Sequence, residues 1–367
     1  MIYTVTINPS IDKHITIAKL IKDDAIRAKS MRRDPGGKGI NVSRVVSELK
    51  SKTRAFAIIG GCAGYMMRDL LENNKIDFNV IETIGETRIN VIITDLSDRT
   101  QTRISTEGPK VNSGTIDNFV ALLDKADPRP SFWVLGGSLP PGAPKDTYKT
   151  IIEHLRKRGE KCALDADGEA LHLGIEAVPF MIKPNEYELE RLIGKPIGND
   201  NEIAKAATEL CDSGIEIVIV SLGKKGAVVA TKDQAFKLES PSVEAKSKVG
   251  AGDSLIGGLL TALEKGWDIE KAARYGVAAG TAAVLTEGTR LCLREDVERL
   301  FGLIKVTTLY KRNKVIVKDI VCGMRIEESQ ASAKTSFKSA RYSFCSLVCK
   351  EKFNSDPDKY INRGQNK

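Results

Sequence analysis

The feature that most constrains the fold of this chain is an alternation of short β-branched runs with amphipathic stretches over the first 303 residues. The runs typical of strands occur at 3–7, 54–59, 132–136, 161–165, 179–183 and 216–221. The helical patterns between them include 41–50, 146–158 and 201–214. This rhythm predicts an α/β fold with a mostly parallel sheet and helices on both faces. Such sheets bind ligands at the carboxyl ends of their strands, in the loops that lead into helices.

Two segments interrupt the rhythm, at 11–34 and 87–105. Both alternate polar and apolar residues and contain turns, as antiparallel strand pairs do. Antiparallel pieces inserted into a parallel α/β domain commonly form a flap over the site. We therefore expect a small β lid built from these two segments.

A third change of pattern marks a domain boundary near 305–317, where the chain becomes basic and lacks glycine. We predict a first domain over 1–304, a basic linker over 305–317 and a small second domain over 318–362. Residues 304–367 hold 14 Lys and Arg against 6 Asp and Glu, which accounts for the whole formal charge of +8. Such a tail can contact acidic partners, but a solvated surface is the favoured interpretation.

Composition excludes several classes of function. No apolar stretch approaches the roughly 20 residues that span a bilayer, and the first residues lack a basic leader and an apolar core. We expect a cytoplasmic protein without a membrane partner. Nucleic-acid binding is disfavoured because aromatic stacking platforms and a recognised binding motif are lacking. With three histidines in the chain and no G-x-x-x-x-G-K-[ST] motif, histidine catalysis and a P-loop are also disfavoured.

The stretch "VGAGDSLIGG" (249–258) places Gly250, Ala251 and Gly252 at the start of an apolar helix, with Asp253 in its first turn. The free N–H groups and the dipole of a helix N-terminus attract anions, and glycine lets a phosphate approach the backbone. An acid beside a transferring phosphoryl group can accept the proton of the attacking hydroxyl. The alternative is an aspartate that merely caps the helix.

Three further stretches contain polar groups at the starts of helices or turns. A second glycine-rich turn contains Gly37, Lys38 and Asn41, which can hold a phosphorylated or hydroxyl-rich substrate, or which form a plain turn with a solvent-exposed lysine. Asn185 and Glu188 share one helical face, where their oxygens can hold Mg²⁺ through water, or where the acid simply opens a helix. The segment "VSLGKKGAVV" (220–229) predicts a strand, a glycine turn and a strand, and alone is weak support for a nucleotide site.

In order along the chain, seven stretches resemble the PfkB branch of the ribokinase-like sugar kinases. They are "NPSID" (8–12), "GGKGIN" (36–41), "TRIN" (87–90), "GGSLPPG" (136–142), "KPNEYELE" (183–190), "SLGKKG" (221–226) and "VGAGDS" (249–254). The resemblance covers residues 1–303. It implies a three-layer α/β/α sandwich with a small β lid, and ATP- and Mg²⁺-dependent phosphorylation of a sugar hydroxyl in carbohydrate metabolism.

The resemblance also implies roles for individual residues. Asp253 would be the catalytic base, with Gly250, Ala251 and Gly252 forming the anion hole for the γ-phosphate. The ATP-binding positions are Lys183, Asn185, Glu188, Ser221, Gly223 and Gly226, of which Asn185 and Glu188 organise Mg²⁺. The substrate-binding positions are Asp12, Arg27, Gly37, Lys38, Asn41, Arg88 and Ser138, with both arginines contacting a phosphate already on the sugar.

Within the family, "GGSLPPG", "TRIN" and "GTRLC" (288–292) are typical of phosphosugar kinases rather than of ribokinase itself. The segment 274–292 is most similar to the minor bacterial 6-phosphofructokinase branch, which favours fructose 6-phosphate as substrate and a place in glycolysis. Lys38 departs from that branch, which typically has glycine there. The lysine is more typical of 1-phosphofructokinases and tagatose-6-phosphate kinases, which stay open as alternatives. A lid that pairs between subunits would give a homodimer.

The tail resembles a YHS domain, a small treble-clef-like, metal-associated module, through "KDIVCGM" (318–324), "ARYSFCSLVCKEKF" (340–353) and "DPDKY" (356–360). Thiolates of Cys322, Cys345 and Cys349 can bind a soft or borderline metal such as zinc or copper. A fourth ligand would have to come from elsewhere, and the alternative is that the cysteines only fill a small core. A different class of function, a metal- or redox-responsive regulator on a kinase fold, also rests on these cysteines.

Overall fold

The computed structural model describes residues 1–361 except 248 and 313–314, and leaves the side chain of Ser329 undescribed. Residue 362 and part of the predicted linker therefore lie outside the described residues. The chain divides into two compact units, the first ending at Tyr310 and the second starting at Lys311. Within the described residues, none of the helices has the length and apolarity needed to cross a bilayer.

The first unit is built on a ten-stranded sheet. In spatial order its strands are β14 (Lys305–Lys311), β13 (Gln234–Glu239), β12 (Ala227–Ala230), β11 (Ile217–Ser221), β10 (Met181–Ile182), β9 (Cys162–Asp165), β8 (Phe132–Gly136), β1 (Ile2–Thr6), β4 (Thr53–Ile59) and β5 (Asp77–Glu82). The seven strands from β11 to β5 pair in parallel, whereas β12 and β13 pair antiparallel. The predicted, mostly parallel sheet is confirmed.

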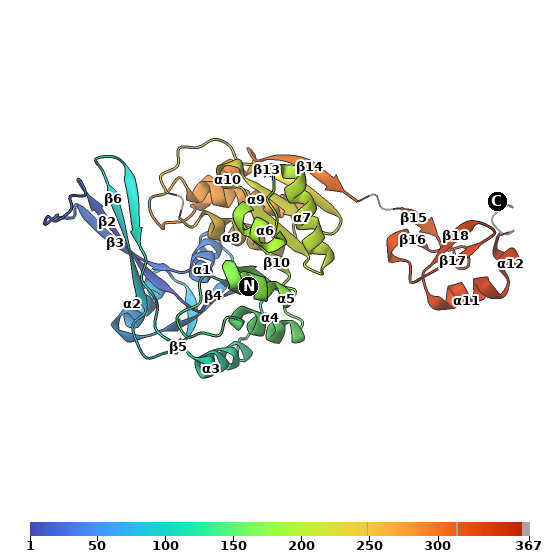
Figure 1. Ribbon diagram of the computed structural model, residues 1–367, viewed down its shortest axis with the longest axis horizontal. Helices are drawn as coiled ribbons and strands as arrows, with labels where there is room; N and C mark the ends of the chain where they lie inside the picture. Colours follow the sequence, from blue (N-terminus) through green and yellow to red (C-terminus); the bar gives the residue numbers. More distant parts are fainter. Residues whose placement is uncertain (248, 313–314, 362–367) are drawn as a thin grey trace. The chain divides into compact units, whose positions relative to one another are not determined.

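Helices cover both faces of this sheet (Figure 1). One face carries α3 (Ser113–Asp124), α4 (Thr147–Lys157), α5 (Gly168–Glu176), α6 (Glu186–Ile193) and α7 (Asp200–Asp212). The other face carries α1 (Lys38–Glu48), α2 (Gly61–Asn73), α8 (Ala251–Glu264), α9 (Ile269–Ala283) and α10 (Arg294–Phe301). Side chains alternate between the two cores along each strand, as the two-residue period of a strand requires: Trp133 enters one core and Phe132 and Val134 the other.

The two segments that interrupt the rhythm form a separate four-stranded sheet, the lid. Its strands in order are β3 (Ser30–Gly36), β2 (Ser10–Ile17), β6 (Arg88–Asp95) and β7 (Thr100–Ile104). Each segment contributes one antiparallel pair, but the central pair β2–β6 is parallel, which the sequence did not predict. The reason is that β2 follows β1 and β6 follows β5, so both leave parallel strands of the main sheet at the same end. Figure 1 shows β2, β3 and β6 extending away from that sheet.

The first residues of the predicted linker are part of the main sheet. Residues 305–311 form β14, the strand next to β13. Val306 and Leu309 pack against the two cores, while the lysines at both ends are exposed. Exposed basic residues with apolar residues between them are typical of an edge strand, which we interpreted as a linker.

The described residues of the second unit, 311–312 and 315–361, form two hairpins and two short helices. The hairpins are β15 (Ile316–Lys318) with β16 (Arg325–Glu327), and β17 (Ala333–Phe337) with β18 (Ala340–Phe344). The helices are α11 (Leu347–Ser355) and α12 (Pro357–Ile361). Short 3₁₀ turns also occur among the described residues, at Gly223–Lys225 in the first unit and Glu328–Gln330 in the second. Ala333, Phe344, Cys349 and Phe353 form the small core.

Candidate active site

A cluster of charged side chains lies at the carboxyl ends of the central strands. Asp165 is the last residue of β9, and Lys183 directly follows β10. Lys38 and Asn41 belong to the first turn of α1, and Asp253 to the first turn of α8. Because the sheet is parallel at these strands, segments far apart in the sequence bring their polar groups to one edge.

Asp253 is almost completely buried, with 8% of its surface exposed. Its Oδ2 accepts a hydrogen bond of 2.8 Å from Asn41 Nδ2. Burial disfavours the ionised form and the nearby Asp165 adds a like charge, so the pKa of Asp253 is raised to about 6 despite that hydrogen bond. A carboxylate with this pKa is ionised at neutral pH and still basic enough to take a proton from a hydroxyl.

The turn before Asp253 is free to bind an anion. Gly250 is the N-cap of α8 in a left-handed conformation (φ 79°), and no side chain among the described residues caps the helix. Asp253 therefore does not cap the helix, and that alternative is wrong. The first N–H groups of α8, at Ala251 and Gly252, point out of the helix without an intrahelical acceptor, as expected of a phosphate-binding helix start.

Lys183 supplies the cation that this glycine turn lacks. A side-chain carbon on Gly252 would lie 3.3 Å from Lys183 Nζ, so the ammonium group is packed against the turn. Lys183 Nζ also lies 3.3 Å from Asp165 Oδ1, and Lys38 Nζ lies 3.0 Å from the same oxygen. Burial favours the neutral acid, but the two lysines outweigh it and lower the pKa of Asp165.

Lys38 is held as a cation by the same cluster. Burial opposes its charge, but Asp165, Asp253 and, more weakly, Glu188 raise its pKa. The sequence prediction included Lys38 and Lys183 but missed Asp165. Its only sequence signal is an acid at the end of a buried strand.

Asn185 and Glu188 cap α6 reciprocally. Asn185 Oδ1 accepts from the Glu188 N–H at 2.8 Å, and Glu188 Oε2 accepts from the Asn185 N–H at 2.9 Å. This capping box occupies one oxygen of each side chain and holds both in place. The side-chain oxygens of Asn185 and Glu188 fit the preference of Mg²⁺ for carboxylate and amide oxygens combined with water.

The predicted nucleotide turn lies beside this cap. The Ser221 N–H donates to the Pro184 carbonyl at 3.0 Å, so the end of β11 is pinned next to Asn185. Gly223 and Gly226 both have positive φ, 58° and 102°, in the turn between β11 and β12. The predicted strand, glycine turn and strand are confirmed.

The lid contributes a second polar group, around Asp12. Asp12 is 2% exposed and accepts from Ser10 Oγ at 3.0 Å and from Asn90 Nδ2 at 2.9 Å. Arg88 Nη2 donates to the Asn8 carbonyl at 3.1 Å.

Two buried polar atoms near this group have no partner among the described residues, Arg88 Nε and Asn8 Oδ1. Buried polar groups are normally hydrogen-bonded, so Arg88 Nε can donate to a phosphate oxygen and Asn8 Oδ1 can accept from a hydroxyl group of a ligand.

The remaining predicted substrate residues differ in position. Ser138 accepts a hydrogen bond from Asn8 Nδ2 at 3.2 Å and so joins the Asp12 group. Gly37 is the N-cap of α1, where its backbone has φ 110°. Arg27 is exposed in the segment between β2 and β3, close to the bond from Lys29 N–H to the Thr16 carbonyl. That bond is at the end of β2 away from Asp12, so Arg27 does not join the cluster within this chain. Asn8 and Asn90 are further residues that sequence reasoning missed.

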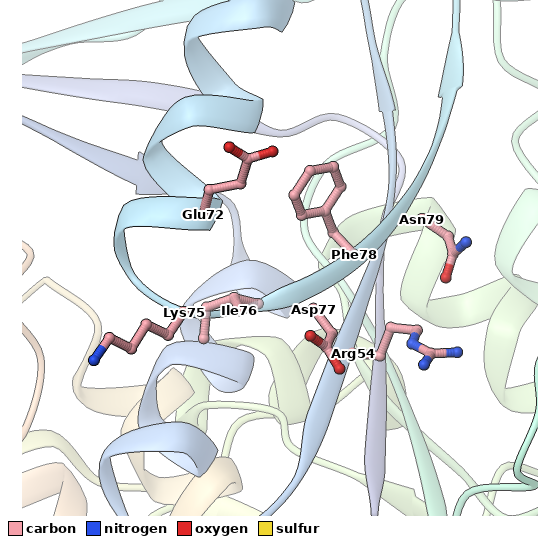
Figure 2. A pocket seen from close by; sticks show the side chains of 7 residues that line it. All are labelled: Arg54, Glu72, Lys75, Ile76, Asp77, Phe78 and Asn79. Carbon is pink, nitrogen blue, oxygen red and sulfur yellow. The ribbon is translucent and has the colours of Figure 1, made fainter.

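A large open pocket lies away from this cluster. It has a volume of about 660 Å³ and is lined by Arg54, Glu72, Lys75, Ile76, Asp77, Phe78 and Asn79 (Figure 2). Arg54 and Asp77 stand at the amino ends of β4 and β5. The pocket is therefore at the opposite edge of the sheet from Asp253 and contains none of the predicted site residues.

The second unit holds a separate cluster of potential metal ligands. Cys322, Cys345, Cys349 and Asp319 place one ligand atom each within 4.8 Å of the others. The Cys345 sulfur lies 3.5 Å from that of Cys322 and 3.6 Å from that of Cys349. The sequence prediction left the fourth ligand open and missed Asp319.

Comparison with known proteins agrees with both units. Residues 5–296 match the family model described as pfkB family carbohydrate kinase, and residues 317–364 match the YHS domain. The chain is 34% identical to the 1-phosphofructokinase of Bacillus subtilis over 84% of this chain and 100% of that protein. It is 32% identical to ATP-dependent 6-phosphofructokinase isozyme 2 of Escherichia coli over 83% of this chain and 98% of that protein.

A solved structure of phosphofructokinase-2 from Escherichia coli, in complex with substrates and products, superposes with a TM-score of 0.78. The identity is 30%, and the match covers 82% of this chain and 98% of the other. The same enzyme has been solved in a tetrameric inhibited form, which matches with a TM-score of 0.77.

Proposed function

The chain belongs to the pfkB family of carbohydrate kinases, and on that premise we propose that it is an ATP-dependent phosphofructokinase. It transfers the γ-phosphoryl group of ATP to a hydroxyl of fructose 6-phosphate, giving fructose 1,6-bisphosphate and ADP. The observation that carries the proposal is Asp253, a buried base with a pKa of about 6 beside an uncapped helix start and a lysine.

Asp253 takes the proton of the attacking hydroxyl while Asn41 holds its carboxylate in position. The N–H groups of Ala251 and Gly252, together with Lys183, stabilise the charge that develops on the transferred phosphoryl group. Asn185 and Glu188 would hold Mg²⁺, which would supply positive charge to neutralise the phosphates. Ser221, Gly223 and Gly226 form the turn that carries the nucleotide.

Asp12, Asn41 and Ser138 orient the sugar, and Arg88 binds the phosphate that the sugar already carries. The stretches at 136–142, 87–90 and 288–292 favour a phosphosugar as substrate, and the segment 274–292 favours fructose 6-phosphate. Fructose 1-phosphate and tagatose 6-phosphate stay as alternatives, since relatives named for both phosphofructokinase activities match almost equally well. The cation at Lys38 is compatible with each of these phosphosugars, because all three carry a negatively charged phosphate.

The test is an ADP-release assay with the three phosphosugars at equal concentrations. The proposal predicts that fructose 6-phosphate gives the highest kcat/KM. A higher kcat/KM for either alternative would reassign the substrate. If none of the three sugars leads to ADP release, the assignment as a phosphofructokinase is refuted.

We also propose a homodimer formed through the lid. Large apolar side chains are exposed on it, with Met31 53% exposed, Ile89 36% and Ile104 51%. Exposed apolar patches of this kind mark interaction surfaces. Light scattering after size-exclusion chromatography should give twice the mass of 40.0 kDa, and Ile104→Lys should shift the protein toward the monomer.

A second function is supported by the cluster in the tail, which we propose binds zinc or copper. Three thiol groups and a carboxylate can complete a four-coordinate site. Asp319 already orders the cluster: its Oδ1 accepts from the Val321 N–H at 2.9 Å and its Oδ2 from the Cys345 N–H at 2.8 Å. Whether the metal regulates the kinase is tested by ADP release from the full chain with and without zinc. Equal rates would rule out regulation of the kinase by zinc.

A further inference from the structure

The loop between α9 and α10 is bound to the lid by a chain of hydrogen bonds. Thr289, which is buried in this loop, donates from Oγ1 to Asp34 Oδ2 at 2.7 Å. Its oxygen lies 2.8 Å from His14 Nε2. A hydroxyl group has one proton, so the oxygen that donates to Asp34 accepts from the His14 Nε2–H group. Thr289 thus joins two lid strands, β2 through His14 and β3 through Asp34.

Other contacts keep the same loop against the lid. Arg32 on β3 donates from Nη2 to the Glu287 carbonyl at 3.2 Å and from Nε to Asp34 at 3.1 Å. A side-chain carbon on Gly288 would lie 2.6 Å from the His14 ring and 2.9 Å from Arg32 Nη2. The loop and the lid are therefore packed without space for another side chain. When the lid moves, the loop either moves with it or loses these contacts.

The other end of the loop contacts the phosphate-binding turn, which is our name for Gly250–Gly252 at the start of α8. Leu291 is buried with a positive φ of 67°, and its Cδ2 lies directly against the position that a side chain on Gly250 would occupy. The Leu291 carbonyl is held by Thr286 Oγ1 at 2.8 Å. Gly250 is the N-cap of α8, so the loop reaches the helix start that carries Asp253.

We propose that the segment from Glu287 to Leu291 is a latch that couples lid closure over the sugar to the position of the phosphate-binding turn, with Thr289 as its positioning residue. This inference rests on the proposed function, because it concerns the coupling of the two substrates of that reaction. The sugar contacts the lid through Asp12 and Arg88, and the lid holds the latch through His14 and Asp34. The latch then holds Leu291 against Gly250, and Gly250 begins the helix that receives the γ-phosphate.

The consequence is a thermodynamic coupling between the sugar and the nucleotide. A phosphosugar that closes the lid should tighten nucleotide binding, and the nucleotide should tighten sugar binding by the same factor. Coupling factors of about 5 to 150 are typical of such systems. Thr289→Val removes the hydroxyl group while keeping the shape of the side chain, and Thr289→Ser restores the hydroxyl.

The experiment measures binding of a non-hydrolysable ATP analogue to the full chain by calorimetry, with and without saturating phosphosugar. The phosphosugar is fructose 6-phosphate, or whichever of the three sugars the ADP assay identifies. We expect Thr289→Val to reduce the coupling factor to near 1 while leaving analogue affinity without sugar within about twofold of the original protein. Thr289→Ser should keep the coupling. His14→Ala, which breaks the latch from the lid side, should act like Thr289→Val, and the double variant should lose no more.

Three outcomes would overturn the proposal. One is a full coupling factor in Thr289→Val, the second is equal weakening of analogue binding with and without sugar, and the third is strictly additive effects of the two substitutions. If Thr289→Val does not fold, the His14→Ala variant decides alone. Absence of ADP release with every phosphosugar would count against the proposed function instead, and is seen in the unmodified protein before any variant is made.

Discussion

Replacing Asp253 with Asn tests the catalytic assignment and the physical state of the base together. The substitution keeps the size of the side chain. It leaves an oxygen that can still accept a hydrogen bond from Asn41 Nδ2, which lies 2.8 Å from Asp253 Oδ2 in the original protein. It removes the negative charge and the ability to take a proton. We expect the rate of phosphoryl transfer to fall by about 10²- to 10⁴-fold, as for the loss of a general base.

The same substitution should stabilise the folded protein. Asp253 is buried, and burial together with Asp165 raises its pKa from 3.8 to about 6. That difference of about two units corresponds to about 3 kcal/mol of folding free energy lost when the carboxylate is ionised. Because the pKa is higher in the folded state, the loss begins above pH about 4 and is complete above pH about 6. Asn carries no charge, so the variant does not lose this folding free energy.

The assay is urea unfolding of both proteins at pH 4.5 and pH 8, combined with the ADP assay. Asp253→Asn should be more stable than the original protein by about 3 kcal/mol at pH 8 and by only about 1 kcal/mol at pH 4.5, where the loss has just begun. Asp200→Asn, at a half-buried ion pair with Lys237, is the control and should show no such gain. A folded Asp253→Asn protein with near-normal turnover would refute the assignment as base. An inactive variant that is less stable at pH 8 would refute the argument from burial.

Three further predictions concern the same sites. Since only ionised Asp253 accepts a proton, kcat/KM should fall tenfold per unit below pH about 6 and be level above it, as a pH–rate profile measures; a flat profile from pH 5 to 8 would contradict this. Lys183→Met should lower kcat about 10²- to 10³-fold, because it removes a donor from the phosphoryl group and leaves Asp165 with Lys38 alone, whereas Lys157→Met, at the exposed end of α4, is the matched control for steady-state kinetics. Cys345→Ser should abolish stoichiometric cobalt or zinc binding by the tail, seen as loss of the thiolate-to-cobalt absorption band, while Cys62→Ser, at an exposed cysteine outside the tail, should not.

The arrangement of the main sheet could be predicted because its pattern is local. β8 matches the predicted run at 132–136, and β1, β4 and β11 are within one residue at each end. β10 is shorter than predicted, two residues instead of five. The Phe180 carbonyl accepts hydrogen bonds from the N–H groups of both Glu216 and Ile217. This irregular pairing shortens the strand, and a run of apolar residues in the sequence does not predict it.

The candidate site was predictable only where its residues are local in sequence. Asp253 follows its own glycine turn, and Asn185 and Glu188 are three residues apart, as in a capping box. Asp165 is paired with Lys38 across 127 positions, and an acid at a strand end is too common to predict that contact. Asp319 was missed for the same reason: its carboxylate organises the backbone around Cys345, 26 positions later.

Strand β14 has a practical consequence for anyone who separates the kinase from its tail. A truncation after residue 304 would remove the strand beside β13 and leave that strand as a new open edge, with its N–H and C=O groups free to pair with another chain. Val306 and Leu309 would also no longer cover the two cores. Aggregation of such a shortened protein would then be a consequence of the lost strand, and it would give no information about the role of the cysteines. The cut belongs after Lys311, where the last strand of the sheet ends.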